Sequence, residues 1–186
     1  NPYYDNGIKI FKKNGEKLND KEEERIEKIL DSLKVKPNIR KKKIVNKVLN
    51  FESYKKGILK KFSQSKFSIK IALDCANGSV SEIAPHFFKE IGCEVVKYSS
   101  KPNGVNINKN CGAMYPKKIA RLTRQTKADI GLSFDGDADR VIISDEKGQV
   151  LDGDTIIAII AKYYGLKKKF KIHSIVSTYM CNLGFR

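Results

Sequence analysis

The 186-residue sequence has no tryptophan, only two histidines and only two methionines, and none of its apolar runs approaches the roughly 20 residues that a membrane span needs. Its first residues also lack the charged start and apolar core of a signal peptide. We therefore expect no membrane association and a cytoplasmic location. The chain starts without methionine and stops just after an apolar, strand-like run, so we expect a piece of a longer protein.

Cysteine is scarce, and no two cysteines form a C-x-x-C pair. The four are Cys75, Cys93, Cys111 and Cys181. This spacing provides neither the paired ligands of a zinc site nor the dense framework of a disulfide-stabilised domain. We expect free thiols in a reducing compartment.

Acidic residues are outnumbered, because 21 aspartates and glutamates stand against 37 lysines and arginines, which gives a net charge of +16. Basic clusters at residues 40–43 and 167–169 could neutralise the phosphates of a nucleic acid. However, the basic residues are mostly lysine and are spread along the chain, without zinc-finger spacing or an RNA-recognition motif. A non-catalytic, nucleic-acid-binding role is therefore the weaker alternative, whereas the positive field favours a small anionic substrate.

Helix and strand patterns alternate from about residue 54, which is typical of an α/β layer architecture. The patterns predict helices at 53–63, 80–91 and 116–127, strands at 68–76, 93–98 and 129–134, and a hairpin at 141–151. We expect an α/β fold in which helices are layered against a mixed sheet.

Further elements are predicted on both sides of this region. Asn19 and Glu22 form a capping box that begins a helix near the start of the chain. Asp154 is expected to cap a helix that ends at Gly165, and residues 172–178 are expected to form another strand.

Three aspartates spaced two residues apart follow the predicted strand 129–134 directly. They are Asp135, Asp137 and Asp139. Carboxylates at this spacing can converge on one ion where the backbone turns at the end of a strand, and Gly136 is expected to permit that turn. Hard oxygen ligands suit Mg²⁺, with water or a phosphate oxygen completing the shell. Arg140 beside them can hold a phosphoryl oxygen, and this combination favours phosphoryl transfer.

Two other interpretations compete with a magnesium site. The first is a calcium-binding EF-hand loop, in which the aspartates would occupy positions 1, 3 and 5 and Glu146 position 12. That loop requires glycine at position 6, where this chain has Arg140, and helices rather than β-branched strands on both sides. The second is a polar surface loop without a ligand, in which the three carboxylates would repel one another. The missing glycine, the flanking strands and this repulsion together favour the magnesium site.

Four segments, in this order along the chain, resemble the α-D-phosphohexomutase family. They are residues 1–9 (Asn-Pro-Tyr-Tyr-Asp-Asn-Gly-Ile-Lys), 74–78 (Asp-Cys-Ala-Asn-Gly), 108–112 (Asn-Lys-Asn-Cys-Gly) and 135–140 (Asp-Gly-Asp-Ala-Asp-Arg). The resemblance covers essentially the whole chain. It implies a three-part layout, in which residues 1–53 end a first domain, residues 54–150 form a second domain with the metal loop, and residues 151–186 begin a third.

The resemblance also implies an activity, a cofactor and a substrate. The reaction would interconvert glucosamine 6-phosphate and glucosamine 1-phosphate through a phosphoserine and a bisphosphorylated intermediate, with Mg²⁺ as cofactor and a hexosamine phosphate as substrate. A phosphomannomutase or phosphoglucomutase of the same family is the alternative. The serine would lie two residues before Asn1, so we expect the 186-residue chain alone to lack mutase activity.

Within this family pattern, Lys9 corresponds to a lysine that assists proton transfer. We also expect Arg140 to be catalytic, because its guanidinium can hold a phosphoryl oxygen. The three aspartates correspond to the metal ligands. One segment departs from the pattern, because Ala113, Met114 and Tyr115 stand where Ser-Thr-His usually follows Cys-Gly. We interpret Asn77-Gly78 as a turn at the end of a strand.

Overall fold

The computed structural model describes residues 2–5, 9–33, 51–62, 66–166, 174–182 and 184. The chain divides into two compact units, one of residues 5–50 and one that combines residues 1–4 with residues 51–186. The basic clusters at residues 40–43 and 167–169 lie outside the described residues. None of the described helices has both the length and the apolar character that crossing a membrane requires.

The unit of residues 5–50 contains the helix α1 (Asp20–Ser32). The predicted capping box holds its first turn. The Asn19 side chain accepts a hydrogen bond from the Glu22 backbone N–H at 3.0 Å, and the Glu22 carboxylate accepts one from the Asn19 N–H at 2.9 Å. These bonds satisfy N–H groups that would otherwise be unpaired at the helix start. The predicted helix is confirmed.

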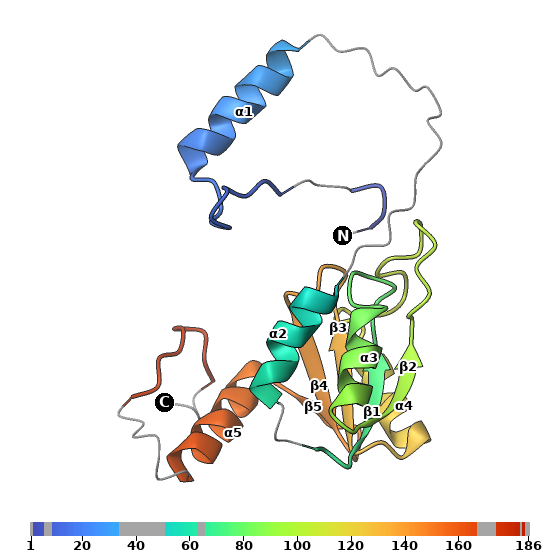
Figure 1. The fold of residues 1–186 in the computed structure, drawn as a ribbon. Helices are drawn as coiled ribbons and strands as arrows, with labels where there is room; N and C mark the ends of the chain where they lie inside the picture. Colours follow the sequence, from blue (N-terminus) through green and yellow to red (C-terminus); the bar gives the residue numbers. More distant parts are fainter. Residues whose placement is uncertain are drawn as a thin grey trace. The chain divides into compact units, whose positions relative to one another are not determined.

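The larger unit is built on a five-stranded sheet with the order β2-β1-β3-β4-β5 (Figure 1). The strands are β1 (Lys70–Asp74), β2 (Glu94–Tyr98), β3 (Ile130–Phe134), β4 (Val141–Asp145) and β5 (Val150–Leu151). β1 pairs in parallel with β2 and β3, whereas β4 pairs antiparallel with β3 and β5. The predicted α/β fold with a mixed sheet is confirmed.

Helices cover both faces of this sheet (Figure 1). The helices of the unit are α2 (Glu52–Phe62), α3 (Ile83–Glu90), α4 (Pro116–Thr126) and α5 (Gly153–Leu166). Successive strand residues point to opposite faces. Ile71 and Leu73 therefore pack in the cluster that contains Ala84 of α3, while Ala72 packs with Ile119 of α4. β1 is the centre of the core, because its side chains belong to both clusters. Full burial of a leucine or isoleucine side chain stabilises a fold by about 1.5–3 kcal/mol.

Two predictions near the end of the chain are wrong. The residue that caps α5 is Asp152 rather than Asp154, because the Asp152 carboxylate accepts a hydrogen bond from the Thr155 backbone N–H at 2.7 Å. Asp154 already lies inside the first turn, where its carboxylate accepts the Asn182 N–H. Residues 174–178 of the predicted strand 172–178 are not in a strand, and its first two residues lie outside the described part.

Candidate metal centre

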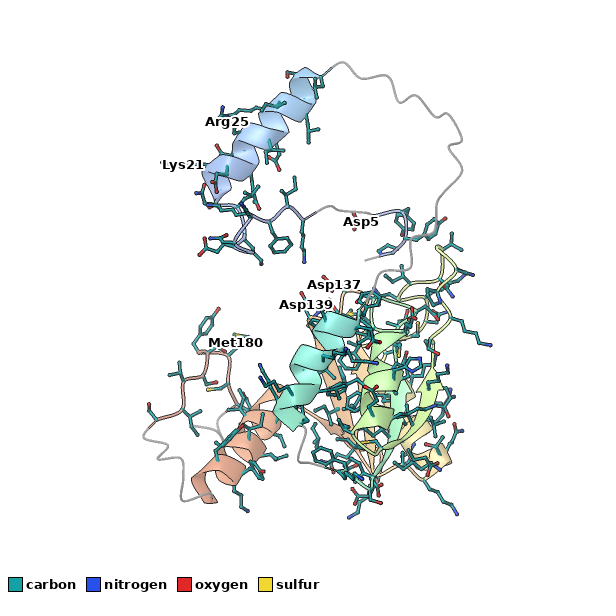
Figure 2. The ribbon with its side chains drawn as sticks, in the orientation of Figure 1. Asp5, Lys21, Arg25, Asp137, Asp139 and Met180 are labelled. Atoms are coloured by element: carbon teal, nitrogen blue, oxygen red, sulfur yellow. The ribbon has the colours of Figure 1, made fainter. Side chains whose placement is uncertain are left out.

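The predicted metal loop lies where the carboxyl ends of two parallel strands meet. β1 ends at Asp74 and β3 ends at Phe134, and the register places Asp74 beside Ser133. Residues 135–140 then turn the chain into the antiparallel strand β4. Figure 2 shows Asp137 and Asp139 at this end of the sheet.

The three aspartates come together as the sequence predicts. Asp135, Asp137 and Asp139 can each offer a carboxylate oxygen such that the three oxygens lie within 4.8 Å of one another. Asp135 is 2% exposed, whereas the other two side chains are exposed. Within the described part of the chain, this is the one group of three or more carboxylate, imidazole or thiol side chains with such a spacing. A set of oxygen donors alone fits a hard divalent cation.

Arg140 holds the buried member of this group. Its Nε and Nη2 each lie 2.9 Å from Asp135 Oδ2, and its backbone N–H donates to Asp135 Oδ1 at 3.1 Å. Burial raises the pKa of the Asp135 carboxyl, but the backbone and guanidinium hydrogen bonds from Arg140 outweigh it, so this pKa lies below its ordinary value. Asp135 is therefore ionised at neutral pH, as a metal ligand must be.

The reason why position 136 is glycine differs from the prediction. The left-handed residue of the loop is Ala138, with φ 61°, and Gly136 is not among the residues with positive φ. Instead, a Cβ at Gly136 would lie 2.7 Å from Asn108 Nδ2 and 2.8 Å from Ile107 Cδ1. Gly136 is required because the neighbouring loop packs directly against it.

The turn that follows β1, which the sequence did not connect to the metal loop, is in contact with it. The Ser79 backbone N–H donates to the Gly136 carbonyl at 2.9 Å, and a Cβ at Gly78 would collide with that carbonyl. Asn77, with φ 48°, forms the predicted turn at the end of β1. The missed signal was topological, because turns that follow neighbouring parallel strands lie at the same edge of a sheet.

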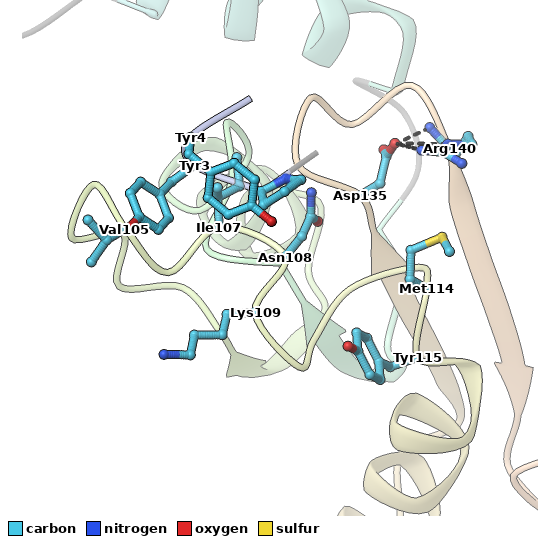
Figure 3. Close-up of a pocket in the computed structure, with 11 residues that line it drawn as sticks. Tyr3, Tyr4, Val105, Ile107, Asn108, Lys109, Met114, Tyr115, Asp135 and Arg140 are labelled. Atoms are coloured by element: carbon cyan, nitrogen blue, oxygen red, sulfur yellow. Dashed lines mark hydrogen bonds and ion pairs between the residues drawn. The ribbon is translucent and has the colours of Figure 1, made fainter. Parts of the chain in front are cut away.

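Asp135 and Arg140 also border a pocket of about 660 Å³ (Figure 3). Its other lining residues include Tyr3, Tyr4, Val105 and Ile107. Met114 and Tyr115, from the segment that departs from the family pattern, line it too, and the Tyr115 hydroxyl donates to Asn110 Oδ1 at 3.3 Å. An acidic and basic corner is thus joined to an aromatic and apolar surface, which suits an anionic ligand with an apolar face.

Lys9, the remaining predicted site residue, belongs to the unit of residues 5–50. It is exposed and borders a groove between the first residues of that unit and α1. Its role in proton transfer stays a prediction.

The comparisons with known proteins agree on one family. The model of the phosphoglucomutase/phosphomannomutase α/β/α domain II matches residues 51–148. Curated phosphoglucosamine mutases are 44% identical in Dictyoglomus turgidum, 43% in Mesorhizobium japonicum and 41% in Campylobacter hominis, over 99%, 99% and 98% of this chain. This chain spans 42% of the length of each of these relatives.

A solved structure supports the same assignment. The crystal structure of a phosphoglucomutase/phosphomannomutase family protein from Burkholderia thailandensis is similar with a TM-score of 0.51 and 28% identity. The match covers 60% of this chain and 25% of that one.

Proposed function

Because this chain belongs to the phosphoglucomutase/phosphomannomutase family, we propose that it forms part of an enzyme that interconverts glucosamine 6-phosphate and glucosamine 1-phosphate. The observation that carries the proposal is the convergence of Asp135, Asp137 and Asp139 at the carboxyl end of β3. The three relatives named above are phosphoglucosamine mutases, and their names support the substrate.

In the proposed reaction, a phosphoserine passes its phosphoryl group to the free hydroxyl of the sugar phosphate. The sugar then carries two phosphoryl groups, and the serine oxygen is left as the leaving group. The serine then takes the phosphoryl group that the sugar carried at the start, which regenerates the phosphoserine and releases the isomeric monophosphate. Each transfer moves one phosphoryl group and one proton, so the enzyme ends as it began.

The three aspartates would hold Mg²⁺. They fit this ion because all of their donor atoms are carboxylate oxygens, and because three of them leave coordination positions for a phosphoryl oxygen or water. Bound Mg²⁺ would withdraw negative charge from the phosphoryl group. The Arg140 hydrogen bonds keep Asp135 ionised and oriented, so one ligand is in place before the ion arrives.

Arg140 would also contact the substrate. Its Nε and Nη2 donate to Asp135, yet its side chain is 65% exposed and borders the pocket. The remaining N–H groups of the guanidinium can donate to a phosphoryl oxygen. We propose Lys9 as the group that moves the proton of the attacking or leaving hydroxyl.

The three-part division at residues 53 and 150 belongs to this proposal, and the match of the domain II model to residues 51–148 supports it. We also propose a cytoplasmic enzyme. All four cysteines are free thiols, which is typical of a reducing compartment.

A phosphomannomutase or phosphoglucomutase is the second candidate, and the name of the matching domain model favours it. A competition assay on the whole protein with the 6-phosphates of glucosamine, mannose and glucose distinguishes the two. We expect the highest kcat/KM for glucosamine 6-phosphate. A higher kcat/KM for mannose 6-phosphate or glucose 6-phosphate would instead identify the enzyme as a phosphomannomutase or phosphoglucomutase.

The same assay tests the catalytic proposal. We expect Asp137→Asn to lower kcat of the whole protein by at least about 100-fold, because a metal ion offsets several kcal/mol of transition-state charge. Glu146→Gln removes a carboxylate from the β4–β5 turn and should leave kcat unchanged. We expect the 186-residue chain alone to be inactive. Activity of Asp137→Asn at the wild-type rate would refute the role of the loop.

The non-catalytic alternative makes a different prediction. A nucleic-acid-binding protein with this charge would bind generic DNA with an affinity that falls steeply as salt rises. At physiological salt we expect this protein to bind generic DNA with a Kd no lower than about 1 μM. Tighter binding, in a protein without mutase activity, would favour the alternative.

A further inference from the structure

Besides Asp135, one other acidic side chain is buried in the described part of the chain. Asp74, at the end of β1, is 0% exposed. Its Oδ1 accepts the Ala76 N–H at 3.0 Å, and its Oδ2 accepts the Gly112 N–H at 3.0 Å. Burying a carboxylate is costly unless hydrogen bonds compensate the lost solvation. The two backbone N–H groups therefore stabilise Asp74 in this position.

The two N–H groups belong to two different turns. Ala76 begins the turn of residues 76–79, which we call the Gly78 turn. Gly112 belongs to the loop of residues 106–113, which we call the Asn108 loop. The Asn108 N–H donates to the Ala76 carbonyl at 2.9 Å, so backbone and carboxylate together join the Gly78 turn to the Asn108 loop.

Both turns contact the backbone of the metal loop. On one side, the Gly78 turn donates the Ser79 N–H to the Gly136 carbonyl. On the other side, Ile107 and Asn108 of the Asn108 loop leave no room for a Cβ at Gly136. Gly136 is therefore enclosed by two segments whose separation depends on Asp74.

The Asn108 loop is also attached to the residue just before the first metal ligand. The Ala113 N–H donates to the Phe134 carbonyl at 2.9 Å, and a Cβ at Gly112 would lie 2.7 Å from the same oxygen. Asp74 binds the N–H of Gly112, and the next residue, Ala113, binds the Phe134 carbonyl at the end of β3. Asp74 therefore helps to fix the backbone directly before Asp135.

We infer that Asp74 is a positioning residue for the metal loop: by bridging the Gly78 turn and the Asn108 loop, it sets the backbone that aims the carboxylates of Asp135, Asp137 and Asp139. This inference rests on the proposed function, because it needs the loop to bind a metal. Asp74 itself is not a ligand. It acts as outer-shell groups do, whose loss typically weakens metal binding by about 10- to 100-fold.

Electron paramagnetic resonance can test this inference with Mn²⁺ as the ion. Asp74→Asn keeps the shape of the side chain but replaces one acceptor oxygen by a donor NH₂, so one of the two backbone N–H groups loses its partner. We expect Asp74→Asn to bind Mn²⁺ about 10- to 100-fold more weakly than the wild type.

Asp129→Asn is a matched control. The Asp129 carboxylate accepts the Lys70 backbone N–H at 2.6 Å, at the opposite end of the same strands. The Asp129→Asn variant should have a lower unfolding temperature without metal, because this hydrogen bond is lost. Its Mn²⁺ affinity should stay within about twofold of the wild type, because Asp129 touches neither turn. If Asp74→Asn behaves in the same way, Asp74 is structural only and the inference is wrong.

A wild-type protein that binds no Mn²⁺ would refute the proposed metal site, and the inference with it. A wild type that binds while Asp74→Asn binds equally well would refute the inference alone. The two failures are therefore distinguishable.

Amide hydrogen exchange of the wild type keeps the test decisive if Asp74→Asn does not fold. We expect Mg²⁺ to slow exchange in the Gly78 turn and the Asn108 loop as well as in residues 135–140. Protection confined to residues 135–140 would show that the two turns are not coupled to the ion.

Discussion

At the scale of single residues, the ion pair between Arg140 and Asp135 determines how the metal loop responds to acid. The pKa of Asp135 lies below its ordinary value of 3.8, so the pair stabilises the fold above that pH and ceases to do so as pH falls through the lowered pKa. Arg140→Gln should reduce the loss of thermal stability between neutral pH and pH about 3, because the carboxyl then titrates more nearly as in the unfolded chain. An unchanged acid dependence in Arg140→Gln would contradict this account.

Cys75 should produce the opposite dependence at alkaline pH. Burial raises the pKa of its thiol from an ordinary 9.0 to about 12, and the carboxylate of Asp74 adds to this effect. The unfolded chain therefore loses this proton first, and stability should fall by up to about 1.4 kcal/mol per pH unit above pH about 9. Denaturant unfolding of wild type and Cys75→Ala at pH 8 to 10 measures this. The free energy of unfolding of Cys75→Ala should fall less steeply with rising pH than that of the wild type, whatever its value at pH 8.

The residues of the candidate site were predictable to the extent that their reasons are local. The spacing of Asp135, Asp137 and Asp139, and the adjacent Arg140, predicted a cluster that the structure forms. The reason for Gly136 was not predictable, because it depends on Asn108, which is far away in sequence. The position of Lys9 relative to the loop stays untested, and so do the roles of these residues.

At the scale of elements, the contact between α4 and the sheet allows a paired test. Gly131 of β3 lies under α4, where a Cβ would be 2.9 Å from Ile119 Cγ1 and would collide with the Thr123 hydroxyl. That hydroxyl also bonds to Ser144 Oγ at 2.7 Å inside the core. Gly131→Ala should therefore destabilise the fold by about 1–3 kcal/mol in denaturant unfolding.

Gly57→Ala is the control for that substitution. Gly57 is exposed within α2, and nothing lies within 4 Å of its added Cβ. The same change should stabilise the protein by about 0.5–1 kcal/mol, because alanine has the higher helix propensity. Equal effects of the two substitutions would show that packing under α4 is not the cause.

The elements themselves were mostly predictable, for reasons that α4 illustrates. Pro116 suits a first helical turn, and buried residues recur at helical spacing behind it. The cap of α5 was not, since Asp152 and Asp154 are both good N-cap residues and only the observed Thr155 bond selects Asp152. Residues 174–178 of the predicted strand 172–178 are not in a strand, because an apolar, β-branched pattern is only a weak indication of a strand.

At the scale of the whole molecule, the core of the larger unit lies within the residues that match the domain II model. Both apolar clusters are formed by residues between Leu59 and Ile143, and every described strand lies between residues 70 and 151. We expect a protein of residues 51–151 to fold by itself and to unfold cooperatively when followed by circular dichroism. A non-cooperative transition would contradict the proposal that this region is a domain of its own.

The central claim is that residues 135–140 bind one divalent cation, and the most direct test is a Mn²⁺ titration of the chain by electron paramagnetic resonance. Wild-type protein should bind one ion, Asp137→Asn should bind it at least about 10-fold more weakly, and Glu146→Gln should bind it as the wild type does. No binding by the wild type, or equal binding by Asp137→Asn, would contradict the claim. If Glu146→Gln is weakened as strongly as Asp137→Asn, the loop binds its ion in the manner of an EF-hand instead.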